Sequence, residues 1–281
     1  MLPITTRKEL NQHLSLVKKN QKLGLVPTMG ALHLGHVALV KRAILENDVV
    51  VVTIFVNPTQ FNNKKDLENY PQTLNTDIAI LKEISENILV FAPSTKEMYT
   101  NEVTSKNYNF GGLEYVMEGA FRGGHFNGVG TIVESLFKIV KPDSAYFGEK
   151  DFQQLQIIRK LVEIKKIPVK IIGCPIVRES NGLALSSRNE RLSKSTRNEA
   201  GFIYKTLISA KKLFGTESAN IIKDWVRNQF KDHPELELEY IEVTETKTLK
   251  PIIRKRQNRK YRAFIAVYAD GVRLIDNIAL N

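Results

Sequence analysis

Two histidines and two glycines stand close together near the N-terminus, in the stretch Pro27-Thr28-Met29-Gly30-Ala31-Leu32-His33-Leu34-Gly35-His36. The apolar run 23–26 predicts a strand before this stretch, and the apolar residues of 37–45 predict a helix after it. Glycines allow a ligand to approach the backbone, and the free N–H groups at a helix start attract phosphate. The two imidazoles could then donate hydrogen bonds to phosphoryl oxygens as their charge develops. A tight turn with structural histidines is the alternative.

Three other segments carry polar side chains of the kinds that bind nucleotides. They are Asn57 and Gln60 after the apolar run 49–56, Lys150, Asp151 and Gln154 after the apolar run 145–147, and Ser186, Ser187 and Arg188 in the polar segment 178–189. None of these is specific alone, because a lysine after a strand is often a surface charge and a Ser-Ser-Arg segment is often only a loop. Together with the histidines they supply the cationic and hydroxyl donors that nucleotidyl transfer requires.

The order of elements predicts how these segments are positioned. Strands and helices alternate over roughly the first 175 residues, which is typical of a parallel sheet with helices on both faces. In such a sheet, segments that follow strands gather at the carboxyl edge, where ligands bind. Beyond Cys174-Pro175, predicted helices are followed by strands near 236–243, 263–268 and 272–278. We therefore expect an α/β, Rossmann-like doubly wound domain over 1–176 and a smaller α+β domain over 177–281 that carries the Ser-Ser-Arg loop.

Local signals predict some boundaries. Thr6 to Glu9 has the form of a capping box and predicts a helix to about residue 19. Thr196 to Glu199 has the same form and predicts a helix that Gly215 ends. The glycine-dense segment 119–128, which carries Arg122 and His125, is predicted to be a loop before a helix over 129–140.

Composition limits the class of protein. The 281 residues include one cysteine, which excludes an internal disulfide, and no apolar run approaches the roughly 20 residues of a membrane helix. The N-terminus lacks an apolar signal core, so we expect a cytoplasmic protein with no membrane association. The net charge is +11, and one cluster comprises Lys250, Arg254, Lys255, Arg256, Arg259, Lys260 and Arg262. An RNA-binding module is one interpretation, but no aromatic residue interleaves with residues 254–260 to stack bases, so a solvated surface is favoured and no nucleic acid is expected.

The polar segments, with their neighbours, resemble those of the pantothenate synthetase (pantoate–β-alanine ligase) family. The matching stretches are 27–36, Phe55-Val56-Asn57-Pro58-Thr59-Gln60-Phe61, Arg122-Gly123-Gly124-His125-Phe126-Asn127-Gly128-Val129, Phe147-Gly148-Glu149-Lys150-Asp151-Phe152-Gln153-Gln154 and Gly182-Leu183-Ala184-Leu185-Ser186-Ser187-Arg188-Asn189. Gly123 stands where many relatives have proline, and Leu185 where methionine is frequent; neither difference removes a polar group. The first stretch is similar to the histidine signature of class I aminoacyl-tRNA synthetases and related nucleotidyl transferases.

The resemblance implies a reaction and its participants. ATP and (R)-pantoate would form an enzyme-bound pantoyl adenylate with release of pyrophosphate, and β-alanine would then displace AMP to give pantothenate, a coenzyme A precursor. Mg²⁺ would accompany ATP without a site fixed by the protein alone, and the enzyme would be a homodimer. Another nucleotidyl transferase, such as a cytidylyl- or adenylyltransferase, is the nearest rival, but it would have no use for two glutamines that face a hydroxy acid.

The resemblance also implies roles for individual residues. His36 would donate a proton, His33 would contact phosphate, and Lys150 would complete the catalytic set. The ATP-binding residues would be Met29, Gly30, Ala31, Leu32, His33, Leu34, Gly35, His36, Gly148, Glu149, Lys150, Asp151, Val177, Leu185, Ser186, Ser187 and Arg188. The pantoate- and β-alanine-binding residues would be Gln60, Gln154, Asn57, Arg122 and His125. For Arg122 and His125, a glycine loop with surface charges is an almost equal alternative.

Overall fold

The computed structural model of the chain describes residues 2–62, 64–99, 101–252 and 254–281. It divides into two compact units. The first comprises Met1–Glu149 and Gln154–Pro175, and the second comprises Lys150–Gln153 and Ile176–Asn281. The division at Pro175 falls one residue before the boundary expected from sequence. The short segment Lys150–Gln153 groups with the second unit, which the sequence did not suggest.

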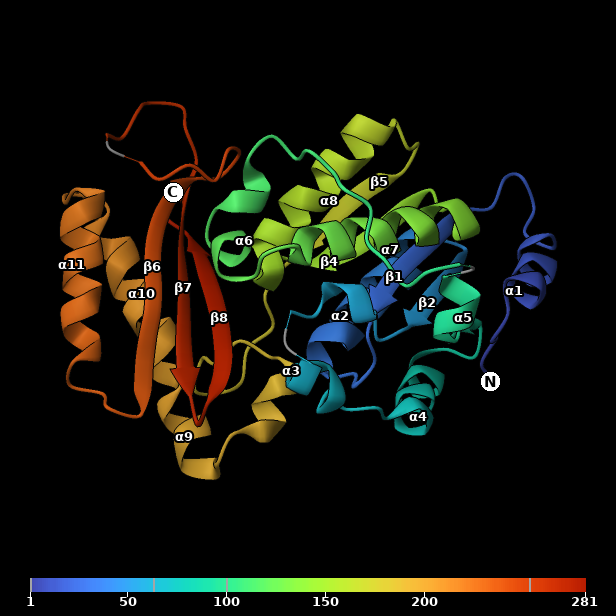
Figure 1. The fold of residues 1–281 in the computed structure, drawn as a ribbon, viewed down its shortest axis with the longest axis horizontal. Coiled ribbons are helices and arrows are strands. Elements are labelled where there is room, and N and C mark those ends of the chain that lie inside the picture. Colours follow the sequence, from blue (N-terminus) through green and yellow to red (C-terminus); the bar gives the residue numbers. More distant parts are fainter. Residues whose placement is uncertain (1, 63, 100, 253) are drawn as a thin grey trace. The chain divides into compact units, whose positions relative to one another are not determined.

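The first unit is built on a parallel sheet (Figure 1). Its strands are β1 (Leu23–Thr28), β2 (Val49–Ile54), β3 (Ile88–Phe91), β4 (Ser144–Gly148) and β5 (Lys170–Cys174), in the spatial order β3-β2-β1-β4-β5. The run of valines in β2 is almost wholly buried, as expected for a strand covered on both faces. The strand order reverses direction at β1, so the carboxyl ends of β1 and β4 form the switch point where such sheets bind ligands.

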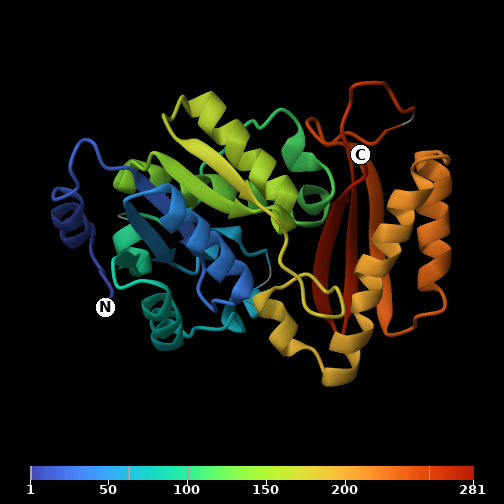
Figure 2. The ribbon, with the colours of Figure 1, turned by 180° about the vertical axis from the view of Figure 1, so that it is seen from behind.

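Helices cover both faces of this sheet. The helices of this part of the chain are α1 (Arg7–Leu14), α2 (Leu34–Glu46), α3 (Lys64–Glu68), α4 (Leu74–Ile84), α5 (Thr95–Met98), α6 (Glu118–Phe121), α7 (His125–Val140) and α8 (Phe152–Lys165), with short 3₁₀ turns η1 (Pro58–Gln60), η2 (Leu113–Tyr115) and η3 (Glu149–Asp151). Figures 1 and 2 show α2 and α7 on opposite faces. The α2 face buries Leu39, Val40 and Ala43 together with Leu81 of α4 against the strands. The predicted doubly wound α/β fold is confirmed.

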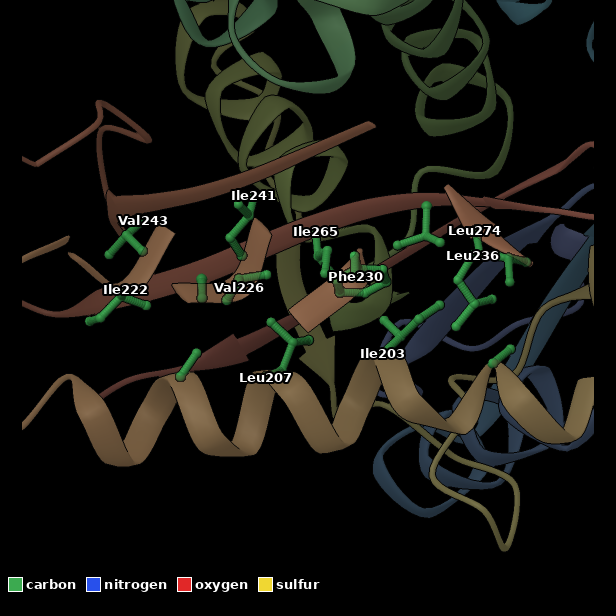
Figure 3. Close-up of a cluster of buried hydrophobic side chains, with 14 of the residues drawn as sticks. Ile203, Leu207, Ile222, Val226, Phe230, Leu236, Ile241, Val243, Ile265 and Leu274 are labelled. Atoms are coloured by element: carbon green, nitrogen blue, oxygen red, sulfur yellow. The ribbon is translucent and has the colours of Figure 1, made fainter. Parts of the chain in front are cut away.

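The second unit is a small α+β fold, also as predicted. Its antiparallel sheet contains β6 (Leu236–Glu245), β7 (Tyr261–Ala269) and β8 (Val272–Ala279), and its helices are α9 (Lys194–Glu199), α10 (Gly201–Leu213), α11 (Ala219–Phe230) and the 3₁₀ helix η4 (Ser187–Arg191). Figure 3 shows side chains of α10, α11 and the three strands pointing toward one another. Ile203, Ile222 and Ile265 are almost fully buried there. This apolar layer holds the sheet in place.

Several local predictions were wrong for identifiable reasons. The predicted loop over 119–128 contains α6 and the start of α7, because Gly124, at φ +79°, precedes a helix rather than a loop. The helix expected from Thr196 begins earlier, since the Ser193 hydroxyl accepts the Thr196 N–H and caps α9; α9 and α10 then meet at Ala200. The polar segment 178–189 runs into η4 at Ser187. The helix expected to reach residue 19 ends at Leu14.

One member of the basic cluster is also misplaced by the sequence interpretation. Arg262 lies in β7 and is 8% exposed, with its guanidinium 3.9 Å from the centre of the Phe152 ring. Its flat, weakly hydrated cation can be buried against an aromatic ring at lower cost than an ammonium. No helix within the described residues is both long and apolar enough to cross a membrane.

Candidate active site

The turn after β1 is shaped by an aspartate from another helix. Gly30 and Ala31 have positive φ values of 82° and 49°. The buried carboxylate of Asp77, in α4, accepts hydrogen bonds from the Ala31 N–H at 3.0 Å and the Leu32 N–H at 2.8 Å. A Cβ on residue 30 would lie 3.0 Å from the same carboxylate, so glycine serves both the backbone conformation and this close approach.

The two histidines are held in one tautomer by the backbone at the start of α2. The Gly35 N–H donates to His33 Nδ1 at 3.1 Å, and the His33 N–H donates to His36 Nδ1 at 3.3 Å. A ring nitrogen that accepts a hydrogen bond carries no proton, so each neutral ring carries its proton on Nε2. The ring centres are 4.1 Å apart. Adjacent rings at the start of α2 therefore carry their protons on Nε2.

The polar side chains that follow β2 orient the side-chain amide of Gln60. Tyr99 OH donates to Asn57 Oδ1 at 2.5 Å, and Asn57 Nδ2 donates to Gln60 Oε1 at 3.2 Å. Burial raises the pKa of Tyr99, so it remains a donor at neutral pH. Asn57 holds Oε1 of Gln60, so Nε2 of the same amide points away from Asn57. Nε2 lies 2.6 Å from Met29 Sδ in the histidine turn. The predicted residues of the turns after β1 and β2 are thus brought together.

The side chains of Arg122 and His125 contact the backbone carbonyl of the same glutamine. His125 Nδ1 lies 2.8 Å from the Gln60 carbonyl oxygen, and Arg122 Nη2 donates to that oxygen at 3.5 Å. Gly128 lets α7 pack directly against η1, since a Cβ there would lie 2.3 Å from the Thr59 carbonyl oxygen. Both predicted side chains therefore contact the backbone of η1.

The remaining predicted residues of the first unit lie on the same edge of the sheet. β4 neighbours β1, and Gly148 is the last residue of β4, followed by Glu149 in η3. Gln154 is half-buried in the first turn of α8. Leu34 is 68% exposed, so its side chain is open to solvent in this structure.

Lys150 and Asp151 belong to the second unit, where a buried asparagine holds the backbone of Lys150. Asn277 Nδ2 donates to the Lys150 carbonyl oxygen at 2.9 Å. The Lys150 side chain is 19% exposed, and its Nζ lies 3.8 Å from Asp151 Oδ1. The ammonium is thereby held near a carboxylate that is itself half-exposed.

The Ser-Ser-Arg loop follows a narrow hairpin. The Leu185 N–H donates to the Val177 carbonyl oxygen at 3.0 Å, and Ser186 Oγ caps η4 by accepting the Arg188 N–H at 3.3 Å. At the base of η4, the fully buried Asn189 donates to Glu179 Oε1 at 2.9 Å. Val177, Leu185, Ser186, Ser187 and Arg188 are all partly exposed. The base of the loop is fixed, while the residues expected to meet ATP remain accessible.

Sequence interpretation missed the residues that support this site. Asp77 gave no signal, because an acidic residue in the first turn of a helix is ordinary. Asp276 and Asn277, two buried polar residues within an apolar strand, did give one, since such positions are normally apolar. Among the described residues, no three His, Cys, Asp or Glu side chains are grouped to hold a metal ion.

Comparison with known proteins agrees with the motifs. A sequence model of the family described as pantoate-beta-alanine ligase matches residues 3–279. Pantothenate synthetase of Christiangramia forsetii is 58% identical over 97% of this chain and 96% of its own, and that of Flavobacterium psychrophilum is 52% identical over the full length of both.

Solved structures agree as well. Pantothenate synthetase from Thermus thermophilus is 39% identical, with a TM-score of 0.91 over 100% of this chain and 99% of that one. Pantoate-beta-alanine ligase from Francisella tularensis, complexed with beta-gamma ATP and β-alanine, is 37% identical, with a TM-score of 0.81 over 100% and 98%. Since the family model, the relatives and the fold all agree over nearly the whole length, the chain belongs to the pantoate–β-alanine ligase family, whose members are the enzymes named pantothenate synthetase.

Proposed function

We propose that this ligase joins (R)-pantoate to β-alanine through a pantoyl adenylate. A carboxylate oxygen of pantoate attacks the α-phosphorus of ATP, and the bond from that phosphorus to the bridging oxygen breaks, so pyrophosphate leaves with the electron pair. The β-alanine amine then attacks the acyl carbon, AMP leaves with the carboxylate oxygen, and the nitrogen loses a proton. No protein nucleophile takes part; the enzyme contributes positioning and charge stabilisation.

The observation that carries this proposal is the paired imidazole arrangement at the start of α2. With both Nδ1 atoms accepting backbone N–H groups, His33 and His36 present Nε2–H donors. Negative charge grows on phosphate oxygens and on the leaving pyrophosphate as the α-phosphorus is attacked, and donors already in place stabilise it without reorganisation. We assign His33 to phosphate binding and His36 to proton donation.

The other assignments follow the same chemistry. Gln60 and Gln154 bind the hydroxyls and carboxylate of pantoate, because an amide offers both donors and an acceptor. Gln60 also helps to place β-alanine, with Asn57, Arg122 and His125 holding η1. Lys150 binds phosphate, Asp151 binds ribose and Val177 lies by adenine. The remaining ATP contacts come from the turn 29–36, from Gly148 and Glu149, and from the loop 185–188.

ATP enters the proposal as a substrate together with Mg²⁺. The ion would supply charge neutralisation on the phosphate oxygens, and no protein ligand set is assigned to it. The ligand pair of the Francisella tularensis structure, beta-gamma ATP and β-alanine, supports two of the three proposed substrates. We also propose that the protein is cytoplasmic, as its sequence leads us to expect, and that it forms a homodimer, as the family resemblance implies. Light scattering of the purified protein at twice the monomer mass would support the dimer, and the monomer mass would contradict it.

Isotope exchange tests the proposed first step. Labelled pyrophosphate should enter ATP when pantoate and Mg²⁺ are present and β-alanine is absent, because adenylate formation is reversible. Exchange without pantoate, or exchange that requires another acid, would indicate a different nucleotidyl transferase. Absence of exchange with ATP, Mg²⁺ and pantoate present would contradict the adenylate.

A further inference from the structure

Strand β8 carries two adjacent buried polar residues whose contacts lie on opposite sides of its sheet. Asp276 is 4% exposed and Asn277 is 1% exposed. Asp276 pairs with Ile265, which packs in the layer under α10 and α11, whereas Asn277 pairs with Phe264. Because side chains alternate along a strand, one dipeptide can reach two different loops.

On one face, Asn277 holds the main chain of Lys150. Its Nδ2 donates to the Lys150 carbonyl oxygen at 2.9 Å, while its Oδ1 accepts from Arg262 Nη1. The Arg262 guanidinium lies 3.9 Å from the centre of the Phe152 ring, which also packs near Phe264. An amide is required here, since one end donates to a carbonyl and the other accepts from a cation. Lys150 and Phe152, which these contacts hold, lie in the segment Lys150–Gln153 that groups with the second unit.

On the other face, Asp276 holds the base of the Ser-Ser-Arg loop. Arg178 Nη1 and Nη2 donate to its two carboxylate oxygens at 2.6 and 3.0 Å. The same guanidinium donates to the Gly182 carbonyl oxygen at 3.0 Å and lies 3.5 Å from the centre of the Tyr204 ring. Gly182 has a φ of +97°, and a Cβ there would lie 2.9 Å from that ring. The hairpin that leads to Ser186 is therefore fixed by a planar, bidentate pair.

We propose that Asp276 and Asn277 are positioning residues for adenylate formation. Asn277 sets the place of Lys150, and Asp276, through Arg178, sets the place of the loop 185–188. Neither residue touches substrate. This inference rests on the phosphate-binding role proposed for Lys150 and for the loop. Its physical basis is that a donor misplaced by about 1 Å can cost about 10²-fold in rate.

A double-mutant cycle tests the Asn277 half, measured as pantoate-dependent pyrophosphate exchange. Asn277→Asp keeps an acceptor for Arg262 but removes the donor to the Lys150 carbonyl; Asn277→Ala removes both. We expect each to lower the exchange kcat by about 10-fold, with little change in KM for pantoate, in the wild-type background. In the Lys150→Ala background we expect less than about a twofold further loss, because the group that Asn277 positions is already absent.

The control comes from the other face of β8. Arg178→Lys keeps the charge beside Asp276 but loses the bidentate guanidinium contact. The fall in exchange kcat that it causes should be as large in the Lys150→Ala background as in wild type. In the Arg188→Ala background that fall should be smaller. A merely structural role predicts equal losses for Asn277 variants in both backgrounds, and that result would overturn the inference while leaving the proposed function intact. If the Lys150→Ala enzyme catalysed pyrophosphate exchange at the wild-type rate, that result would exclude the proposed role of Lys150 and would overturn this inference as well.

Discussion

At the scale of single residues, the histidine turn depends on a carboxylate that touches no proposed substrate. Asp77 accepts two backbone N–H groups, from Ala31 and Leu32, and its Oδ1 also accepts from the Thr73 hydroxyl at 3.2 Å. Since the turn has positive φ at residues 30 and 31, its backbone lies outside the regular hydrogen-bonding pattern of the strand and the helix that flank it. The side chain of α4 therefore fixes the path of the backbone that leads to the imidazoles.

We predict that Asp77→Asn loosens this turn. One oxygen is replaced by an NH₂ group that faces a backbone donor, so the free energy of unfolding should fall by about 1.5–3 kcal/mol, the range for hydrogen bonds to charged groups. Urea unfolding measures this, and pyrophosphate exchange should fall with it. Asp224→Asn is a matched control, because that carboxylate is 68% exposed and paired only on the surface of α11, and it should stay within about 0.5 kcal/mol. Equal behaviour of the two variants would contradict the account.

Lys150 gives a sharper prediction about catalysis. Lys150→Ala should retain the fold but slow adenylate formation by about 10²-fold or more, the scale for loss of one transition-state donor. The backbone of residue 150 would still be held by Asn277, so the thermal midpoint should change little. Single-turnover release of pyrophosphate, with circular dichroism as the fold control, measures this; a near-wild-type rate would exclude the proposed role.

Among the secondary-structure elements, α7 positions Gln60, the glutamine proposed to bind pantoate, by packing closely against η1. Gly128 lies so near Thr59 that a Cβ would be 2.3 Å from its carbonyl oxygen, and His125 on the same helix contacts the Gln60 carbonyl. The same glycines led the sequence interpretation to expect a loop. Glycine content does not distinguish a loop from a helix packed tightly on another backbone, because only the neighbour, distant in sequence, decides between them.

Replacing Gly128 tests this packing. Gly128→Ala should destabilise the fold by about 1–3 kcal/mol through overpacking, despite the better helix propensity of alanine, and should raise KM for pantoate by displacing η1. Gly123→Ala is the control: no atom lies within 4 Å of a Cβ there, and its φ is not positive, so stability and KM should be unchanged. If Gly128→Ala changed neither the stability nor KM for pantoate, α7 and η1 would not be closely packed.

α7 also holds the segment that precedes α6 through one acidic residue, Glu134. Its carboxylate contacts Lys138 Nζ at 2.6 Å and Lys106 Nζ at 3.2 Å and accepts from Tyr108 OH. Burial alone would raise the pKa of Glu134, but these three partners together lower it from 4.5 to about 2. Because the folded-state pKa is the lower one, this group stabilises the fold fully above the unfolded pKa and loses that contribution as the pH falls toward 2.

We therefore predict a pH-dependent cost of Glu134→Gln. The difference in free energy of unfolding between wild type and variant should be constant above about pH 5 and should shrink as the pH falls from about 4.5 to about 2. Urea unfolding across this range measures it. A difference that does not change with pH would show that Glu134 is not charged in the folded state.

Across the molecule, the sequence predicted the features that depend on local residue patterns. The β-branched run of β2 and the periodicity of α4 were enough to place strands, helices and the carboxyl edge, and the motif residues 27–36 and 182–189 were enough to suggest the family. The supporting contacts were not predictable, since Asn277 and Lys150 are 127 positions apart. Nothing local indicates that Lys150 groups with the C-terminal strands or that Asp77 reaches the histidine turn.

If pantoate is activated as an acyl adenylate, one of its carboxylate oxygens must end in AMP, and isotopic labelling can follow that atom. Pantoate labelled with ¹⁸O in its carboxylate should be turned over with ATP, Mg²⁺ and β-alanine, and the nucleotide and pyrophosphate should be examined by mass spectrometry. The account predicts one ¹⁸O in each AMP and none in pyrophosphate, because the attacking oxygen stays on the α-phosphorus. Label in pyrophosphate or phosphate, with unlabelled AMP, would contradict it.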